Sequence, residues 1–153
     1  MIAATQGRSI MTIRHGSWHG TESAAVEVTG TLASGLGEGG YFMAFDWVVD
    51  GFQSRFGFRP YPGTLNLVMR GAAWCRLRSL LARSAGIELP PHPGNCGAKC
   101  FRVLVEQRHP AVLIVPDVPG YPDDKFEIVA PVELRPLLAV ADGGEVHVSV
   151  LPE

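Results

Sequence analysis

A glycine-rich segment is the first group of residues whose types and spacing could do chemistry. It consists of Gly35, Leu36, Gly37, Glu38, Gly39 and Gly40. Glycines allow close backbone approach, so successive N–H groups can point at one anion, typically a nucleotide phosphate. No Gly-Lys-Ser/Thr follows, so this is not a Walker loop. Taken alone, the segment is better explained as a flexible hairpin connection.

A hydroxyl and an amide form the second group, at Thr64 and Asn66. Residues two apart on a strand share a face, and Leu65 and Leu67 would take the opposite face, towards the core. Such a pair of oxygen donors suits Mg²⁺, which keeps waters and completes its shell with phosphates. The alternative is a solvated polar face of a half-buried strand, and the two residues alone favour that alternative.

Glu127 is the third candidate, because it sits among apolar neighbours in a short β-branched stretch. A carboxylate there would accept a hydrogen bond from a substrate hydroxyl or act as a base, unless it simply faces solvent. His92, Cys96 and Cys100 form a fourth group, whose ligand types suit zinc. Their spacing is not that of a zinc knuckle and no fourth ligand is near, so free cysteines are the favoured interpretation.

The elements that must position these residues are short. Alternating and β-branched patterns predict strands over 24–32, 41–43, 64–69, 101–106, 112–115, 126–129 and 145–151. Spacings of three and four predict helices over 45–56 and 72–85, and a short helical turn over 132–138. The segments 87–98 and 117–124 are rich in Pro and Gly and are predicted to be loops.

This pattern predicts a mainly β fold. Six or seven short strands with one or two inserted helices, and no βαβ alternation, favour a small closed β-barrel over a Rossmann-type sheet. The 153 residues, with 18 Gly and 12 Pro, fit one turn-rich domain. Residues 1–22 are expected to be a flexible leader and residues 23–153 the barrel domain.

Composition excludes several classes of partner. The net charge is −2 and no Lys/Arg block exists, so nucleic acid is not expected. No apolar run approaches the roughly 18 residues of a membrane span. Three cysteines, an odd number, indicate reduced thiols and a cytoplasmic location. Nothing suggests an obligate protein partner. Because Lys99 and Lys125 are the only lysines, a phosphate site must rely on backbone amides, arginine or a metal ion.

Several short motifs, unspecific singly, occur here in one order from about residue 26 to 150. Together they resemble the archaeal CTP-dependent riboflavin kinase family. The motifs are Ser34-Gly35-Leu36-Gly37-Glu38-Gly39, Tyr41-Phe42, Gly57-Phe58, Pro60-Tyr61, Gly63-Thr64-Leu65-Asn66-Leu67, Glu127-Ile128-Val129-Ala130-Pro131 and Leu134-Arg135.

The resemblance implies a six-stranded barrel of the cradle-loop type and an enzyme. It would transfer the γ-phosphate of CTP to the ribityl 5′-hydroxyl of riboflavin, giving FMN and CDP. Thr64 and Asn66 would ligate Mg²⁺, and Glu127 would contact riboflavin near the reacting hydroxyl. The residues against CTP would be Gly35 to Gly40 for the phosphates and Val132, Glu133, Leu134 and Arg135 for the cytidine.

Two positions depart from the family's pattern. Gly40 stands where the family usually has a basic residue, and Pro119 stands where it has a threonine near the flavin. Arg55, Arg59, Arg70 and Arg102 are candidates for the missing charge. Two further interpretations therefore stay open: a module that binds nucleotide or flavin without turnover, and the same kinase chemistry on another small polyol.

Overall fold

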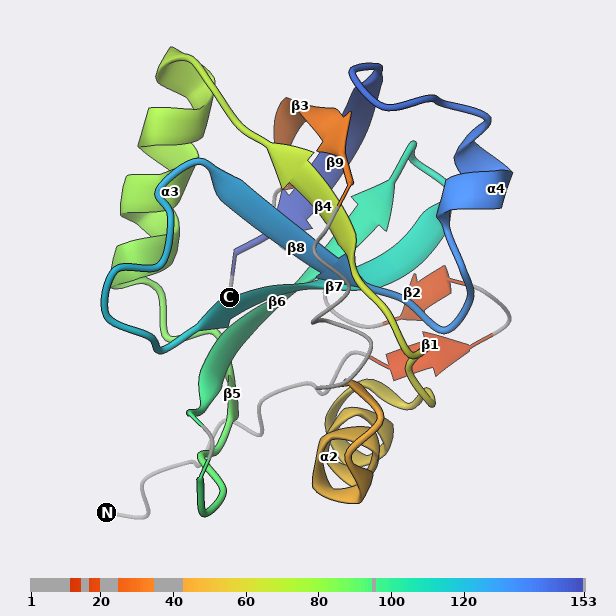
Figure 1. Cartoon of the computed structure of the whole chain (residues 1–153), viewed down its shortest axis with the longest axis vertical. Helices are drawn as coiled ribbons and strands as arrows, with labels where there is room; N and C mark the ends of the chain where they lie inside the picture. The colour runs from red at the N-terminus through yellow and green to blue at the C-terminus, as the bar shows by residue number, and fades with distance from the viewer. Residues whose placement is uncertain (1–11, 15–16, 20–24, 35–42, 95, 153) are drawn as a thin grey trace, which may run out of the picture.

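Six antiparallel strands close into a barrel in the computed structural model, which describes residues 12–14, 17–19, 25–34, 43–94 and 96–152 (Figure 1). The ring closes because the last strand in its order, β9, pairs back with the first, β6. The predicted closed six-stranded, mainly β barrel is confirmed. Around the ring the strands are β6 (Ala98–Val105), β7 (His109–Pro116), β8 (Lys125–Val129), β4 (Leu65–Val68), β3 (Val26–Ala33) and β9 (Glu145–Leu151).

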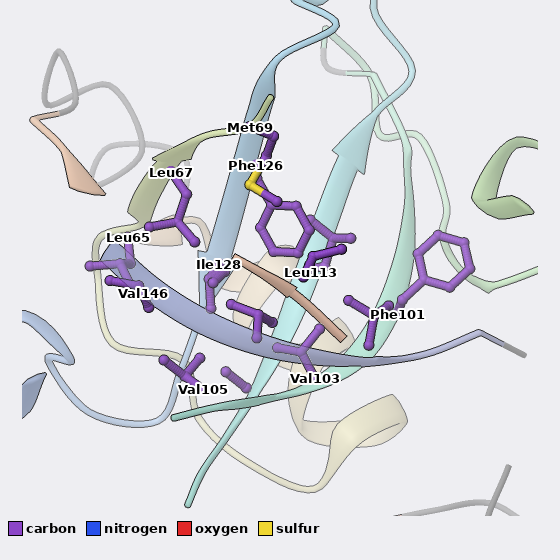
Figure 2. Close-up of a cluster of buried hydrophobic side chains, with 14 of the residues drawn as sticks. Leu65, Leu67, Met69, Phe101, Val103, Val105, Leu113, Phe126, Ile128 and Val146 are labelled. Atoms are coloured by element: carbon purple, nitrogen blue, oxygen red, sulfur yellow. The ribbon is translucent and has the colours of Figure 1, made fainter. Parts of the chain in front are cut away.

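Alternating side chains build the barrel interior. On β3, Val28 and Leu32 are buried, while Glu27, Thr29 and Thr31, which alternate with the inward positions, are exposed. This is the period of two that predicted the strand, and the strand residues of the interior cluster come from such inward positions. Figure 2 shows part of that interior, with Leu65, Leu67, Met69, Phe101, Val103, Val105, Leu113, Phe126, Ile128 and Val146 gathered between the strands.

β3 and β4 approach closely at Gly30. A Cβ atom built there would lie 2.5 Å from the sulfur of Met69 and 2.9 Å from Cβ of Leu67. No other residue type fits this position unless its neighbours move. Glycine at this point of β3 therefore leaves room inside the barrel for the side chains of Leu67 and Met69.

Helix α2 (Asp46–Phe56) covers the outer face of β6 and β7, below the strands in Figure 1. Its buried Val48, Phe52 and Phe56 belong to a second apolar cluster with outward-facing residues of those strands, among them Cys100 and Ile114. β6 and β7 are buried on both faces for this reason. Helix α3 (Ala72–Arg83) instead packs Trp74, Leu77 and Leu81 against the barrel interior. Both helices were predicted, α2 from one residue earlier and α3 to two residues later.

Three local predictions were wrong. Met43, predicted to lie in a strand over 41–43, is helical and buried; residues 41 and 42 lie outside the described part. The predicted loop over 87–98 contains a three-residue strand, β5 (Ile87–Leu89), which pairs with β6. The helical turn predicted over 132–138 is confined to α4 (Arg135–Leu138). A strand of three residues is too short to display a period, which is why β5 was missed.

Part of the expected leader packs on the barrel. β1 (Thr12–Arg14) and β2 (Ser17–His19) form an antiparallel pair. The Trp18 ring meets Phe56 and Phe58 at centroid distances of 6.4 and 6.5 Å, and its Nε1 donates to the Val103 carbonyl oxygen at 2.8 Å. Residues 17–19 are thus tied to β6 and α2, while a domain boundary at residue 22 stays a prediction.

Candidate functional site

The predicted metal ligands lie on β4 and at its start, and the predicted catalytic carboxylate lies opposite them on β8. In the β4–β8 ladder Asn66 pairs with Glu127, and the flanking Leu65 and Leu67 point into the core. Asn66 Nδ2 lies 3.4 Å from Thr64 Oγ1, so the two side chains share the outer face, as their spacing predicts. Thr64, Asn66 and Glu127 are therefore neighbours on one surface of the barrel.

The Thr64–Asn66 pair has a donor set that fits Mg²⁺. Among the described residues no group of three or more His, Cys, Asp or Glu gathers as a metal site. A hydroxyl and an amide oxygen instead suit a hard cation that takes its other ligands from phosphates and water. The contacts from Asn66 Nδ2 to Thr64, both 3.4 Å, are long and hence weak. Rotating the amide to present its oxygen therefore costs little.

Glu127 has a cation for a neighbour. Its carboxylate Oε1 lies 2.5 Å from Lys125 Nζ, and only 13% of the glutamate side chain is exposed. Because Lys125 and Glu127 are two apart on β8, they share the outer face. The Lys125 ammonium in turn lies over the Tyr121 ring, 5.5 Å from its centroid.

The Tyr121 hydroxyl is buried at the same place. It has no hydrogen-bond partner of acceptable geometry among the described residues. Burial, together with the nearby Glu127 carboxylate, raises the pKa of the Tyr121 phenol above its usual value, so the group stays protonated. Sequence reasoning missed this feature, a buried hydroxyl without a well-placed partner next to a carboxylate. The composition of the loop that contains Tyr121 gives no signal of it.

A hollow of about 110 Å³ lies beside Thr64. The residues that the resemblance assigns to the cytidine, Val132 to Arg135, all line it together with Thr64. Tyr61 and Gly63 form another wall, and 37% of the Tyr61 surface is exposed. The structure thus brings the predicted nucleotide-side residues of the 132–135 segment next to Thr64, one of the two predicted metal ligands.

Arg135 is fixed by partners outside the hollow. Its Nη1 lies 2.6 Å from Asp142 Oδ1, and its Nη2 donates to the Ala33 carbonyl oxygen at 3.2 Å. Two of the arginines considered as substitute phosphate ligands are engaged elsewhere: Arg55 Nε donates to the Glu88 carbonyl oxygen, and Arg102 is buried under Trp18. Arg135 itself lines the hollow, so Asp142 and Ala33 hold its guanidinium at the wall of the hollow.

Pro119 lies at the exposed tip of a turn. Tyr121 N donates to the Val118 carbonyl oxygen at 3.2 Å, and Gly120 has a φ of 79°, as a type II turn with Pro119 at its second position requires. The loop residue that approaches Glu127 is Tyr121, two positions further on. The predicted phosphate-binding segment Gly35 to Gly40 lies outside the described residues.

A larger cavity, of about 910 Å³, opens under α3 near Tyr121 and Lys125. Its walls are mostly apolar and include Trp74, Leu81, Phe101 and Leu113. Lys99 also lines it, but the Lys99 ammonium already donates to the Leu81, Ala82 and Ser84 carbonyl oxygens at the end of α3. The cavity therefore offers mainly apolar surface, with charged side chains such as Glu88, Asp117 and Lys125 at its walls.

His92, Cys96 and Cys100 do not form a metal site. Cys100 is buried in the cluster beneath α2, where desolvation raises the pKa of its thiol to about 12. His92 stacks on the Trp47 ring at 5.0 Å. Cys75, Cys96 and Cys100 are all free thiols. None of the described helices combines the length and apolarity of a transmembrane segment.

Comparison with known proteins places this geometry in a family. Residues 32–150 match the CTP-dependent riboflavin kinase model, described as domain of unknown function DUF120. The chain is 32% identical over 129 residues to a riboflavin kinase of Sulfurisphaera tokodaii, covering 82% of this chain and 95% of that protein. It is 33% identical over 129 residues to one of Sulfolobus acidocaldarius, covering 82% and 81%.

A riboflavin kinase of Methanococcoides burtonii is 36% identical over 132 residues, which cover 82% of this chain and 57% of that protein. Barrel and relatives together define a phosphotransferase enzyme of small β-barrel type. The chain belongs to the CTP-dependent riboflavin kinase family.

Proposed function

We propose that this protein transfers the γ-phosphate of CTP to the ribityl 5′-hydroxyl of riboflavin, giving FMN and CDP. The observation that carries the proposal is the meeting of Glu127 with Asn66 across the β4–β8 ladder, with Thr64 beside both Asn66 and the hollow of residues 132–135. One face of the barrel thus carries the carboxylate of Glu127 for the acceptor, then the oxygen ligands of Asn66 and Thr64, and then the hollow for the nucleotide.

Each residue has a distinct task in the transfer. The 5′-hydroxyl oxygen of riboflavin bonds to the γ-phosphorus as the bond to the β,γ-bridging oxygen breaks, and CDP leaves with that electron pair. Glu127 orients the hydroxyl and accepts its proton, and the Lys125 ammonium lies beside the carboxylate. Mg²⁺, when bound, neutralises phosphate charge. Thr64 and Asn66 would hold that ion through their side-chain oxygens.

The large cavity supports an acceptor with a bulky ring. Its volume of about 910 Å³ lies within the usual range for organic ligands, and its apolar walls suit an aromatic system. Tyr121 and Lys125 line its edge and also adjoin Glu127. A short polyol would leave this apolar surface bare, which favours riboflavin over a small polyol as the acceptor.

The proposal is tested by product formation. Purified protein is incubated with riboflavin, Mg²⁺ and either CTP or ATP, and FMN is separated by chromatography. We expect FMN with CTP and little with ATP. Binding of CTP without FMN from any nucleotide would contradict the proposal and point instead to a binding module or to another acceptor, with Pro119 as the first position to change to threonine.

Two variants separate the assigned roles. Asn66→Ala removes an oxygen ligand and is expected to lower kcat/KM by about 10²-fold and to raise the Mg²⁺ concentration needed. Glu127→Gln removes the base and is expected to lower kcat by about 10²-fold or more, with CTP affinity retained. Glu145→Gln, an exposed strand position, is the matched control. Full activity of Asn66→Ala would refute the metal assignment.

A further inference from the structure

The Asp142 carboxylate joins three segments of the chain. Its Oδ2 accepts a hydrogen bond from Ser34 Oγ at 2.5 Å, and its Oδ1 accepts one from Arg135 Nη1 at 2.6 Å. Arg135 also donates from Nη2 to the Ala33 carbonyl oxygen. One acidic side chain therefore links the end of β3, the start of α4 and the turn before β9.

Main-chain hydrogen bonds hold the turn that carries Asp142, independently of its side-chain contacts. Gly143 N donates to the Leu32 carbonyl oxygen and Leu32 N donates to the Gly144 carbonyl oxygen, both at 2.8 Å. Gly143 has a φ of 86°, which a turn of this shape requires and glycine adopts without strain. The turn that carries Asp142 is thus held on β3 by two main-chain hydrogen bonds.

The Arg135–Asp142 pair is too exposed to be a major source of stability. The side chains are 40% and 56% exposed, and ion pairs at such positions stabilise a fold only slightly. Hydrogen bonds from Ser34 and Arg135 lower the pKa of Asp142, so the carboxylate is charged at neutral pH. What the pair changes is the orientation of Arg135, which lines the hollow beside Thr64.

We propose that Asp142 is a positioning residue for the nucleotide donor. It holds the Arg135 guanidinium at the hollow, and it holds Ser34, the residue after which the glycine-rich segment begins in the sequence. This inference rests on the proposed function, because it takes the hollow of residues 132–135 as the nucleotide side. The inference assigns roles to Asp142, which belongs to no motif, and to Ser34, which stands in a motif but had no role of its own.

The test compares Asp142→Ala and Asp142→Asn with the unmodified protein. CTP and CDP affinities are measured by calorimetry, and KM for CTP and for riboflavin by FMN formation. We expect Asp142→Ala to weaken CTP binding about tenfold, which is the loss of one charge-assisted hydrogen bond, with KM for riboflavin unchanged. Asp142→Asn keeps one acceptor oxygen, for Arg135, and offers an NH2 that can donate to Ser34 Oγ, so it should recover part of the affinity.

Asp123→Asn is a control for CTP affinity only, because Asp123 forms another exposed pair with an arginine, Arg78, away from the hollow, but lines the large cavity. It should leave CTP affinity unchanged. Thermal unfolding of each variant checks the fold; if Asp142→Ala does not fold, Ser34→Ala, which removes one of the two links, must still weaken CTP binding. CTP affinity within twofold of the original in both Asp142→Ala and Ser34→Ala would overturn the inference.

The two proposals fail differently. If the unmodified protein binds CTP but makes no FMN, the proposed function is refuted, while the affinity ratio of the Asp142 variants still decides the role of Asp142. If the unmodified protein binds neither CTP nor CDP, both proposals are overturned.

Discussion

At the scale of single residues, the Tyr121 hydroxyl is notable because its hydrogen-bonding capacity is not satisfied by the described residues. It is buried beside the Glu127 carboxylate and the Lys125 ammonium, yet it has no hydrogen-bond partner of acceptable geometry among the described residues. A buried hydroxyl in that state costs stability, and such costs are commonly retained where a ligand supplies the missing partner. A substrate hydroxyl between Tyr121 and Glu127 would satisfy it.

Replacing Tyr121 by Phe should therefore have opposite effects on stability and function. We expect Tyr121→Phe to raise the free energy of unfolding by about 1 kcal/mol, because an unsatisfied polar atom is removed. We expect KM for riboflavin to rise several-fold, with KM for CTP unchanged. Denaturant unfolding and steady-state kinetics measure the two effects. Unchanged KM for riboflavin in Tyr121→Phe would contradict the role given to the hydroxyl.

The cysteines should differ in reactivity at neutral and mildly alkaline pH. Burial raises the pKa of the Cys100 thiol from 9.0 to about 12, whereas Cys75 is exposed. A raised pKa means that the folded state favours the neutral thiol, so this contribution to stability is complete below pH 9.0 and is lost as pH rises towards 12. At pH 8 a thiol reagent should modify Cys75 rapidly and Cys100 only after unfolding. Rapid labelling of Cys100 in the native protein would show that α2 does not cover it.

At the scale of elements, the strands with one buried face were the predictable part. β3 alternates along its length and β9 does so from Glu145 to Val148, and both were predicted. β6 and β7 are apolar on both faces, because α2 covers their outer side, and their ends were placed less well. The order of strands around the ring could not be predicted, since it depends on which edges meet rather than on any local pattern.

The candidate site was predictable only within single strands. The spacing of Thr64 and Asn66 placed both side chains on one face, and they do contact each other. The pairing of Asn66 with Glu127 needs the register between β4 and β8. Ser34 and Asp142 lie 108 residues apart in the sequence, and their hydrogen bond exists only because β3 and β9 are neighbours.

Gly30 should be the least tolerant position of β3. A methyl group there would meet Met69 and Leu67 inside the barrel, and overpacking of this kind costs about 1–3 kcal/mol. We therefore expect Gly30→Ala to lower the free energy of unfolding by that amount, as measured in denaturant. Thr31→Ala, at the exposed neighbouring position, should change it by less than about 0.5 kcal/mol. Equal effects of the two substitutions would mean that β3 and β4 are further apart than described.

At the scale of the whole molecule, Trp18 connects the N-terminal hairpin to the barrel and to α2. Its ring packs on Phe56 and Phe58, the Arg102 guanidinium lies over it at 5.4 Å, and its indole N–H reaches Val103. Arg102 is almost fully buried, and the aromatic ring above it provides part of its environment.

We expect Trp18→Ala to lower the free energy of unfolding by about 2–3 kcal/mol, because it removes ring packing and uncovers a buried cation. Trp18→Phe keeps most of the ring and loses only the hydrogen bond to Val103, so it should cost about 1 kcal/mol. Thermal and denaturant unfolding distinguish the two. A Trp18→Ala protein as stable as the original would mean that residues 17–19 pack on the barrel without contributing to its stability.

The closure of the barrel by β9 has a consequence for how the protein is made. β9 pairs with β3 on one side and with β6 on the other, and a ribosome synthesises it after every other strand of the ring. Until Glu145–Leu151 has emerged from the exit tunnel, the nascent chain holds two open strand edges of the kind that join one chain to another. Barrel closure therefore follows the synthesis of every other ring strand, and chains stalled before residue 145 expose both edges to their neighbours on the same polysome.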